Sequence, residues 1–444
     1  MNRILFIENR SKTTQWSMVA EAFFNQGYSV HFLVQNHLYK LNLTEYHNHI
    51  IKYPNGLINE DLSCPLNIES LVKSLRAYRH FGVKSTKPLK YYANRIFHLI
   101  EDLKPNLVIG EATSVQELIA IEACKYFEIY YIHPSSCRYP PGRFSFYVYD
   151  TLEVISKGAT IDNSQLRSLY HGIQNRSLRP TYMLNRTVKY SKTRYYISKF
   201  YLQLEYLKGE RINTPSVITK LRLERRTKKI LSRLSENFIN YKDFKAIDFS
   251  VLYPMQMEPE ANIDVWGKDA PSQFELIERI TNCLGDREKL VIKLNPKAKY
   301  ELTDNLATMI IDNPKIVVLD PNISMDTIWK DISCIVTITG TVAIEASLSS
   351  IPVGVCANLG HLMNPGMTLI KDNDALREYL ENVRNENFIT PFDGIEYLKA
   401  LYNDSFEGNL GDDLEHSHHL KDENNQLKIN RAFSWLAQKF ITYE

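Results

Sequence analysis

Residues 335–346 read Ile335-Val336-Thr337-Ile338-Thr339-Gly340-Thr341-Val342-Ala343-Ile344-Glu345-Ala346. The stretch starts as a β-rich run, ends in small hydroxylated residues and continues at once with a helical pattern. Gly340 permits a tight approach of the backbone at this turn. The first N–H groups of the following helix have no partner within the helix and favour an anion. Glu345 lies one turn further on, where a carboxylate can bind ribose hydroxyls. The stretch predicts a nucleotide or sugar-phosphate cradle, and the alternative is an ordinary capped turn.

Strand and helix patterns alternate on both sides of this turn. In the first part of the chain, we expect strands at 4–7, 28–34, 105–110 and 129–133, with helices at 16–26, 71–103 and 115–127 between them. A second alternation has expected strands at 249–254, 289–293, 316–319, 334–338 and 353–355. Strands that alternate with helices indicate a parallel sheet covered by helices on both faces. The 444 residues are also too many for one ordinary core.

The sequence therefore predicts an α/β protein of GT-B type, with two Rossmann-like domains facing a cleft. Residues 1–150 are expected to form an N-terminal, acceptor-side domain, and residues 246–404 a C-terminal domain that binds a nucleotide sugar. Between them, 151–245 is expected to be a helical insert of the N-terminal half, with twenty Lys and Arg against seven acids. Residues 405–444 are expected to form a flexible polar loop and a C-terminal helix that packs back.

Composition excludes several classes of protein. The net charge of +2 and the lack of a recognised binding motif argue against a nucleic-acid partner. No apolar run approaches the roughly 20 residues that span a bilayer, and no signal peptide is evident. Six cysteines occur without a C-x-x-C pair, which favours the cytoplasm. The basic stretch 186–229 predicts a solvated face, a surface that contacts anionic lipid on the inner face of the membrane, or a binding surface for a pyrophosphate-linked acceptor.

A metal site is poorly supported by the sequence. His416, His418 and His419 cluster in a polar tail without further ligands. No Asp-x-Asp follows a strand in the first half. We expect no metal and no cofactor, with a nucleotide sugar acting as substrate.

Four segments of the second half resemble one known family, the bacterial capsular polysaccharide biosynthesis glycosyltransferases, which include Kdo transferases. One of them is Ser-Ile-Pro-Val at 350–353, which is similar to that family's glycine-lysine-proline-valine. Residues 251–260, Val-Leu-Tyr-Pro-Met-Gln-Met-Glu-Pro-Glu, look like the start of that family's C-terminal half. Residues 290–296 are similar to its valine-lysine-x-histidine-proline segment, and residues 337–346 resemble its threonine-glycine-threonine turn. Residues 133–144 look, less specifically, like an Arg/Pro loop of surface-polysaccharide enzymes. The resemblance implies metal-independent sugar transfer from a nucleotide-activated donor to a surface-polysaccharide or lipid-linked glycan acceptor.

The resemblance also implies a donor site in the second half. Lys293 is expected to neutralise the departing phosphate. Where the family usually has histidine, this chain has Asn295, which can donate a hydrogen bond but cannot supply a proton near neutral pH. The other residues expected to bind the donor are Gln256, Glu258, Thr339, Gly340, Thr341 and Glu345.

Sugar transfer to a hydroxyl needs a base, which we expect from the first half. Glu111 follows the strand at 107–110 and is the preferred candidate; the alternative is that it simply caps its helix. Glu8 and His133 also follow strands and are expected at the same edge of the sheet. Arg138 and Arg143 are expected to clamp an anionic group of the acceptor, or else to form loop salt bridges.

Two other interpretations remain open. A sugar-nucleotide 2-epimerase shares the architecture and the glycine turn, and it acts on a UDP-sugar without an acceptor. The second interpretation is a non-catalytic GT-B module that binds glycan or forms a scaffold. Asn295, in place of the family's histidine, supports it.

Overall fold

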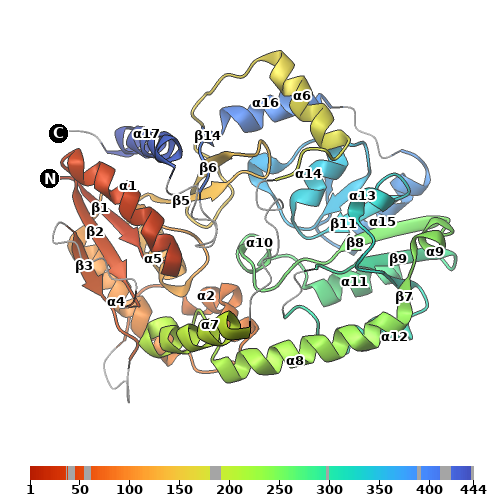
Figure 1. Ribbon diagram of the computed structural model, residues 1–444, viewed down its shortest axis with the longest axis horizontal. Coiled ribbons are helices and arrows are strands. Elements are labelled where there is room, and N and C mark those ends of the chain that lie inside the picture. Colours follow the sequence, from red (N-terminus) through yellow and green to blue (C-terminus); the bar gives the residue numbers. More distant parts are fainter. Residues whose placement is uncertain are drawn as a thin grey trace. The chain divides into compact units, whose positions relative to one another are not determined.

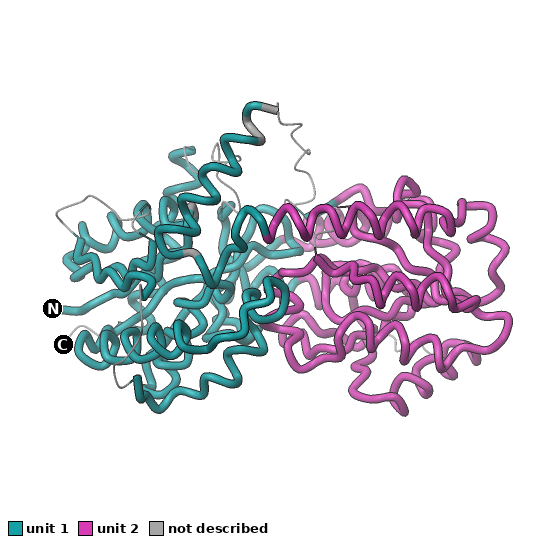
Figure 2. Tube along the Cα trace, turned by 90° about the horizontal axis from the view of Figure 1, so that it is seen from below, with its two compact units in different colours: residues 1–161, 179–218, 399–444 teal, residues 162–178, 219–398 magenta. Residues whose placement is uncertain are grey.

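The computed structural model describes residues 1–36, 38, 46–54, 62–180, 192–296, 300–387, 392–410 and 422–441. The chain divides into two compact units, coloured separately in Figure 2. Unit 1 comprises residues 1–161, 179–218 and 399–444, and unit 2 comprises residues 162–178 and 219–398. The chain therefore passes from one unit to the other four times, at 161/162, 178/179, 218/219 and 398/399. Residues 151–245, expected as one insert, are divided between both units.

Unit 1 is built on a seven-stranded sheet with the order β14-β6-β5-β4-β1-β2-β3. The five strands from β5 to β3 are parallel, while β6 runs antiparallel to β5 and β14 antiparallel to β6. The strands are β1 (Arg3–Ile7), β2 (Ser29–Val34), β3 (His47–Ile50), β4 (Leu107–Ile109), β5 (Tyr131–Ser136), β6 (Arg143–Val148) and β14 (Phe406–Glu407). The central strands read as apolar runs because they are buried on both faces.

The helices of unit 1 come from distant parts of the chain. They are α1 (Thr13–Asn25), α2 (Ile68–Ser74), α3 (Arg76–Arg79), α4 (Lys87–Leu103), α5 (Val115–Tyr126), α7 (Lys192–Glu205), the π-helix η4 (Tyr206–Glu210) and α17 (Glu423–Phe440). The C-terminal α17 lies beside α1 (Figure 1), and Phe433 packs its ring against Trp16 and Phe23. This contact confirms the prediction that the last helix packs back.

Unit 2 is built on seven parallel strands with the order β13-β12-β11-β8-β9-β10-β7. They are β7 (Phe238–Ile239), β8 (Phe249–Pro254), β9 (Glu288–Lys293), β10 (Ile316–Leu319), β11 (Cys334–Thr337), β12 (Val353–Val355) and β13 (Met367–Leu369). Its helices are α6 (Asn163–Gln174), α9 (Tyr241–Lys245), α10 (Ala261–Asp264), α11 (Gln273–Asn282), α12 (Asp304–Asp312), α13 (Met325–Ile328), α14 (Thr341–Leu348) and α15 (Asn373–Arg384). Two further helices, α8 (Val217–Leu234) and α16 (Gly394–Asn403), each begin in one unit and end in the other.

Two units, each built on a largely parallel sheet with helices, confirm the predicted α/β class and the two Rossmann-like domains. One segment differs from expectation: residues 133–144 are a loop only at 137–142, because β5 continues to Ser136 and β6 begins at Arg143. The reason is burial. Phe144 and Phe146 of β6 are fully buried against Phe406 and Phe433, which the chain supplies only near its end. In the part of the chain that the structure describes, no helix is long and apolar enough to span a bilayer.

Candidate functional site

The glycine turn of unit 2 joins β11 to α14, as the sequence predicts. Gly340 has φ of +110°, a backbone conformation that L side chains rarely adopt. A Cβ atom at this position would lie 3.1 Å from Nε2 of Gln256. The turn therefore requires glycine for its backbone, and it presents the N-terminus of α14, where the helix dipole favours an anion.

Gln256, predicted to bind the donor, holds the turn in place. Its Nε2 donates to the Thr339 hydroxyl at 2.7 Å, and its Oε1 accepts from the Thr339 N–H at 3.2 Å. Gln256 is in turn held by the buried Gln273, the first residue of α11. The Gln273 side chain accepts from the Gln256 N–H at 2.9 Å and donates to the Gln256 carbonyl at 2.8 Å and to Glu258 at 2.7 Å. A chain of amide contacts thus connects α11, the loop after β8 and the turn.

Glu345, predicted to bind ribose, forms a buried ion pair in the structure. Its Oε2 lies 2.6 Å from Nη1 of Arg176, and its side chain is only 6% exposed. Arg176 also pairs with Asp326, and its guanidinium carbon lies 4.2 Å from the centroid of the Trp329 ring. The structure does not test the ribose-binding role of Glu345, which stays a prediction, but it adds Arg176 to this group.

Lys293 lies at the end of β9, and its ammonium donates to the backbone carbonyl of Pro321 at 2.9 Å. Burial lowers the pKa of Lys293, although the nearby Asp320 opposes this effect. Asn295 is half-buried two residues beyond. The contacts of Lys293 favour a structural role in joining β9 to the segment after β10, and its role toward a leaving phosphate stays a prediction.

In unit 1, Glu111 lies two residues after the end of β4, with its carboxylate 3.0 Å from the ammonium of Lys12. The Glu111 side chain is 25% exposed. Its backbone is fixed by the Tyr131 hydroxyl, which donates to the Glu111 carbonyl at 2.6 Å. A Cβ at Gly110 would lie 2.2 Å from that hydroxyl, so glycine is needed there. Glu111 is thus a partly accessible carboxylate paired with a cation at the carboxyl edge of the sheet.

Two other carboxylates at this edge are fully buried. Glu8 accepts from the backbone N–H groups of Arg10, Gln35 and Asn36. Glu117, on α5, accepts from the backbone N–H groups of residues 111, 113 and 114. Burial and the Glu111 carboxylate raise the pKa of Glu117, and its hydrogen bonds oppose this shift. These contacts give both carboxylates a role in holding loops, which leaves Glu111 as the better-placed base.

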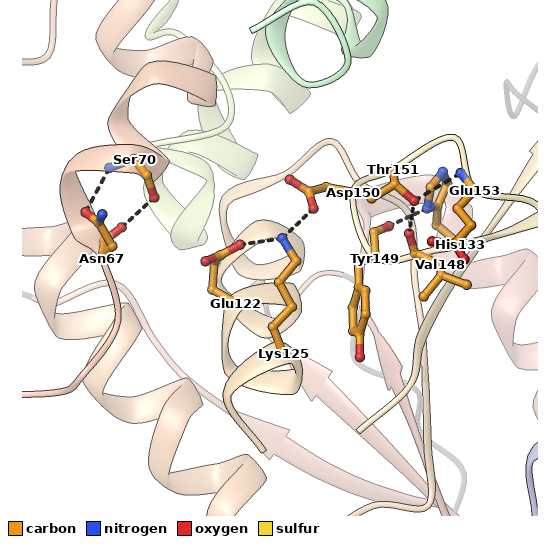
Figure 3. Close-up of polar contacts among 10 residues, drawn as sticks. All are labelled: Asn67, Ser70, Glu122, Lys125, His133, Val148, Tyr149, Asp150, Thr151 and Glu153. Atoms are coloured by element: carbon orange, nitrogen blue, oxygen red, sulfur yellow. Dashed lines mark hydrogen bonds and ion pairs between the residues drawn. The ribbon is translucent and has the colours of Figure 1, made fainter. Parts of the chain in front are cut away.

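His133 is a buried residue of β5. Its Nδ1 lies 2.6 Å from the carbonyl oxygen of Tyr149 (Figure 3). Because a carbonyl oxygen only accepts hydrogen bonds, this contact favours the neutral ring that carries its proton on Nδ1. Burial lowers the pKa of His133 to about 4, so the imidazole is neutral near pH 7. Nearby, Lys125 of α5 pairs with Glu122 and Asp150 (Figure 3), which fixes the turn after β6. The buried position favours the structural interpretation of His133, while a catalytic role stays a prediction.

The two predicted acceptor-binding arginines occupy different environments. Arg138 is half-buried in the turn between β5 and β6. Arg143 is buried and donates from Nε to the Ser405 hydroxyl and from Nη2 to the Ser405 carbonyl, both at 2.7 Å. Its guanidinium carbon also lies 3.8 Å from the centroid of the Tyr402 ring. These contacts favour a structural role for Arg143, and acceptor binding by either residue stays a prediction.

Metal ligands were not expected, and no group of three or more His, Cys, Asp or Glu side chains suited to a metal ion occurs among the described residues. His416, His418 and His419 lie outside those residues.

Sequence reasoning missed Lys12, Arg176 and Gln273. Lys12 had a usable signal, because the loops after β1 and β4 meet when these strands are neighbours in the sheet. Glu117 also had a usable signal, since Ser114 and Glu117 form the S-x-x-E pattern of a helix start. Nothing local marks Arg176 or Gln273, whose partners lie 150–169 and 15–20 residues away.

No protein-family model matches the chain, and none of the curated proteins matches it. Among solved structures, the chain is similar to the UDP-GlcNAc 2-epimerase of Methanocaldococcus jannaschii in complex with UDP-GlcNAc and UDP (13% identity, 90% of this chain and 98% of that chain, TM-score 0.28). It is also similar to the UDP-N-acetylglucosamine 2-epimerase of Rickettsia bellii (14%, 99% and 97%, TM-score 0.29). A third structure is a calicheamicin glycosyltransferase (8%, 100% and 100%, TM-score 0.28). At these values, the likeness extends to no particular site or activity.

Proposed function

We propose that this chain is a nucleotide-sugar enzyme that binds its substrate at the glycine turn of unit 2. The observation that carries the proposal is the turn itself. Gly340 has the backbone conformation that a close approach requires, Gln256 fixes the turn, and the N-terminus of α14 follows. The cation-paired carboxylate of Glu111, at the carboxyl edge of the unit 1 sheet, supplies a candidate base.

Of the two activities considered, the contacts favour a UDP-sugar 2-epimerase over a glycosyltransferase. Sugar transfer needs an acceptor site, and one of its two expected residues, Arg143, is buried against Ser405 and Tyr402. Sugar transfer was also expected to use Lys293 to neutralise the departing phosphate, whereas the Lys293 ammonium contacts backbone carbonyls. Epimerisation needs no acceptor, and a carboxylate such as Glu111 is a suitable base for the sugar C2 proton. The electron pair of the C2–H bond then forms a C1–C2 double bond as the C1–O bond to UDP breaks. Re-addition of UDP at C1, with a proton delivered to the opposite face of C2, gives the 2-epimer.

Glycosyl transfer to a surface-polysaccharide or lipid-linked acceptor remains the second candidate. The resemblance of residues 251–260, 290–296 and 337–346 to capsule polysaccharide glycosyltransferases supports it. Asn295 in place of histidine weakens it, because that side chain supplies no proton.

Incubation of the protein with UDP-N-acetylglucosamine in deuterated water, without an acceptor, separates these activities. A 2-epimerase is expected to produce the 2-epimer with deuterium at C2, as followed by proton NMR, and Glu111→Gln is expected to abolish this exchange. Glu122→Gln, a change away from the sheet edge on α5, is the matched control. A parallel thermal-shift screen with CMP-, UDP-, GDP- and dTDP-sugars tests binding, because a bound ligand raises the melting temperature. Failure of all four to raise it contradicts the proposal.

We further propose that the helices α7 and α8 contact an anionic membrane surface. Large apolar side chains on and just after α7 are exposed, namely Tyr196, Ile197, Phe200, Tyr201 and Leu207. Their spacing places the first four on one helical face. On α8, the exposed basic residues are Arg222, Arg225, Lys228 and Lys229, whereas the half-buried Arg226 donates to the Tyr300 carbonyl. Exposed aromatic residues and cations both suit a lipid interface. Residues 186–191 lie outside the described part.

Sedimentation with vesicles tests this contact. The protein is expected to bind phosphatidylglycerol-containing vesicles more than pure phosphatidylcholine vesicles, and less at high salt. Charge reversal at Arg225, Lys228 and Lys229 is expected to remove the preference for the anionic lipid, and Phe200→Ser with Tyr201→Ser to weaken binding to both. A wild type that sediments with neither vesicle would rule the contact out.

A further inference from the structure

The helix α6 ends in an unusual residue. Arg176 follows the C-cap residue Asn175 and has φ of +58°, in the left-handed region where Gly or Asn is normally found after a helix. The Leu178 N–H closes the turn on the Gly172 carbonyl at 2.8 Å. An arginine in this conformation is less stable than glycine would be, which calls for another reason for its presence.

The side chain of Arg176 supplies that reason. Its Nη1 lies 2.6 Å from Oε2 of Glu345 on α14, and its Nε lies 2.5 Å from Oδ1 of Asp326 on α13. The flat face of the guanidinium covers the Trp329 ring at 4.2 Å. Burial alone would lower the pKa of Arg176, but the carboxylates of Glu345 and Asp326 together outweigh it and raise that pKa. Both Arg176 and Glu345 are nearly buried, with side chains 12% and 6% exposed.

Glu345 belongs to α14, the helix whose start forms the candidate nucleotide site. Glu345 lies one helical turn beyond Gly340, so its carboxylate follows the phosphate cradle along α14. A buried carboxylate keeps its charge and orientation when a cation is paired with it. Lysine could supply the charge but not the planar fork that reaches two acids while stacking on an indole ring.

We propose that Arg176 is a positioning residue that holds the Glu345 carboxylate in the orientation in which it accepts a hydrogen bond from the ribose 2′-hydroxyl, and so makes the site selective for ribonucleotides over 2′-deoxyribonucleotides. This inference rests on the proposed nucleotide site at the glycine turn. It assigns a role in that site to a segment, residues 162–178, whose flanking residues on both sides belong to unit 1.

Calorimetric titration of the full chain with UDP, CDP and GDP, each compared with its 2′-deoxy counterpart, tests the inference. The wild type is expected to prefer one ribonucleotide over its deoxy form by about tenfold or more, the scale of one hydrogen bond to a charged group. Arg176→Met is expected to bring this ratio close to one, mainly by weakening the ribonucleotide. Arg176→Lys is expected to keep part of the preference.

Two further variants separate positioning from simple stability. Glu345→Gln is expected to lose the same preference, and the double variant Arg176→Met/Glu345→Gln to lose no more than either alone, because both act through one contact. Asp326→Asn changes the more exposed partner, at 38%, and is expected to keep most of the preference. If Arg176→Met does not fold, Arg176→Lys and the Glu345→Gln comparison provide the same readout.

The outcomes distinguish failure of the proposed function from failure of the inference about Arg176. If the wild type binds none of these nucleotides, the proposed function fails, and the inference fails with it. If the wild type binds and discriminates but Arg176→Met keeps the full ratio, only the inference is overturned. Equal loss of affinity for both members of a nucleotide pair also overturns it, because that result indicates a structural role for Arg176.

Discussion

Gly340 is the residue on which the nucleotide site depends most directly. With φ of +110°, the position disfavours any side chain, and a new Cβ would meet Gln256 at 3.1 Å. We expect Gly340→Val to abolish nucleotide binding in calorimetric titration and to destabilise the fold by about 1–3 kcal/mol. The backbone strain thus adds a stability cost to the loss of binding.

A control must separate the strain from the loss of the site. Gly82 also has a positive φ, of +72°, and a Cβ at that position would have nothing within 4 Å. Gly82→Val is therefore expected to lower stability without changing nucleotide affinity. Unchanged affinity in Gly340→Val would refute the assignment of the turn.

His133 allows a prediction of how stability depends on pH. Burial lowers its pKa from 6.5 to about 4. Between these two values, the imidazole stays neutral in the folded protein but takes up a proton in the unfolded chain. The contribution is fully present above pH 6.5 and is lost as the pH falls toward 4. Between pH 7 and pH 5, we expect the wild type to lose about 2 kcal/mol more unfolding free energy than His133→Phe.

Urea unfolding at both pH values measures this difference. The phenyl ring keeps the stacking on Tyr147 and removes the titrating group. His31, whose pKa is also lowered to about 4, is present in both proteins, so its contribution cancels. Equal pH dependence in the two proteins would show that His133 titrates normally in the folded state.

At the scale of single residues, the sequence allowed the backbone turn to be predicted better than the side-chain partners. Gly340 and the helix after it follow from local pattern, because glycine and the change of period identify the turn. Arg176 and Gln273 could not be found this way, since their contacts depend on how separate elements pack. The same holds for Arg143, whose partner Ser405 lies 262 residues later.

At the scale of elements, the junction of β6 and β14 depends on Arg143. Two hydrogen bonds to Ser405 and the contact with Tyr402 hold the short strand β14 beside β6. Lysine cannot reproduce the fork or the stacking, so we expect Arg143→Lys to lower the unfolding free energy by about 1–3 kcal/mol. Denaturant unfolding measures this change.

The exposed Arg377, which pairs with Asp374 on α15, is the matched control. Arg377→Lys is expected to change stability by less than about 0.5 kcal/mol, as for most surface pairs. If Arg143→Lys leaves stability intact but removes activity with an acceptor, the acceptor-clamp interpretation gains support instead.

Predictions of elements succeeded where burial on both faces produces a continuous apolar run. The strands β8, β10 and β12 have the predicted bounds. The strands β3, β6, β7, β13 and β14 were missed. They lie toward the edges of the sheets, where the pattern is short or polar, as in His47–Ile50 of β3.

At the scale of the whole molecule, the chain interleaves its two units, which no local pattern predicts. The alternation of strands and helices indicates two Rossmann-like halves, but the early entry of 162–178 into unit 2 and the return of 399–444 to unit 1 depend on long-range packing. The returning C-terminal helix was expected, although the unit on which it packs was not.

The last helix should therefore control the stability of the first unit. Phe433 of α17 is 1% exposed, and its ring packs against Trp16, Phe23, Phe144 and Phe146. Removing it opens a cavity in the unit 1 core, so we expect Phe433→Ala to cost about 3–5 kcal/mol.

Hydrogen exchange can locate this loss within the chain. In Phe433→Ala, the amides of β1 and α1 are expected to exchange faster, although these elements lie near the opposite end of the sequence. Phe274→Ala, at a side chain 36% exposed on α11, is the control and is expected to have a much smaller effect. If β1 and α1 keep their protection in Phe433→Ala, the C-terminal helix does not complete the core of unit 1. Faster exchange confined to α17 itself would lead to the same conclusion, because the helix would then unfold without affecting the sheet that it covers.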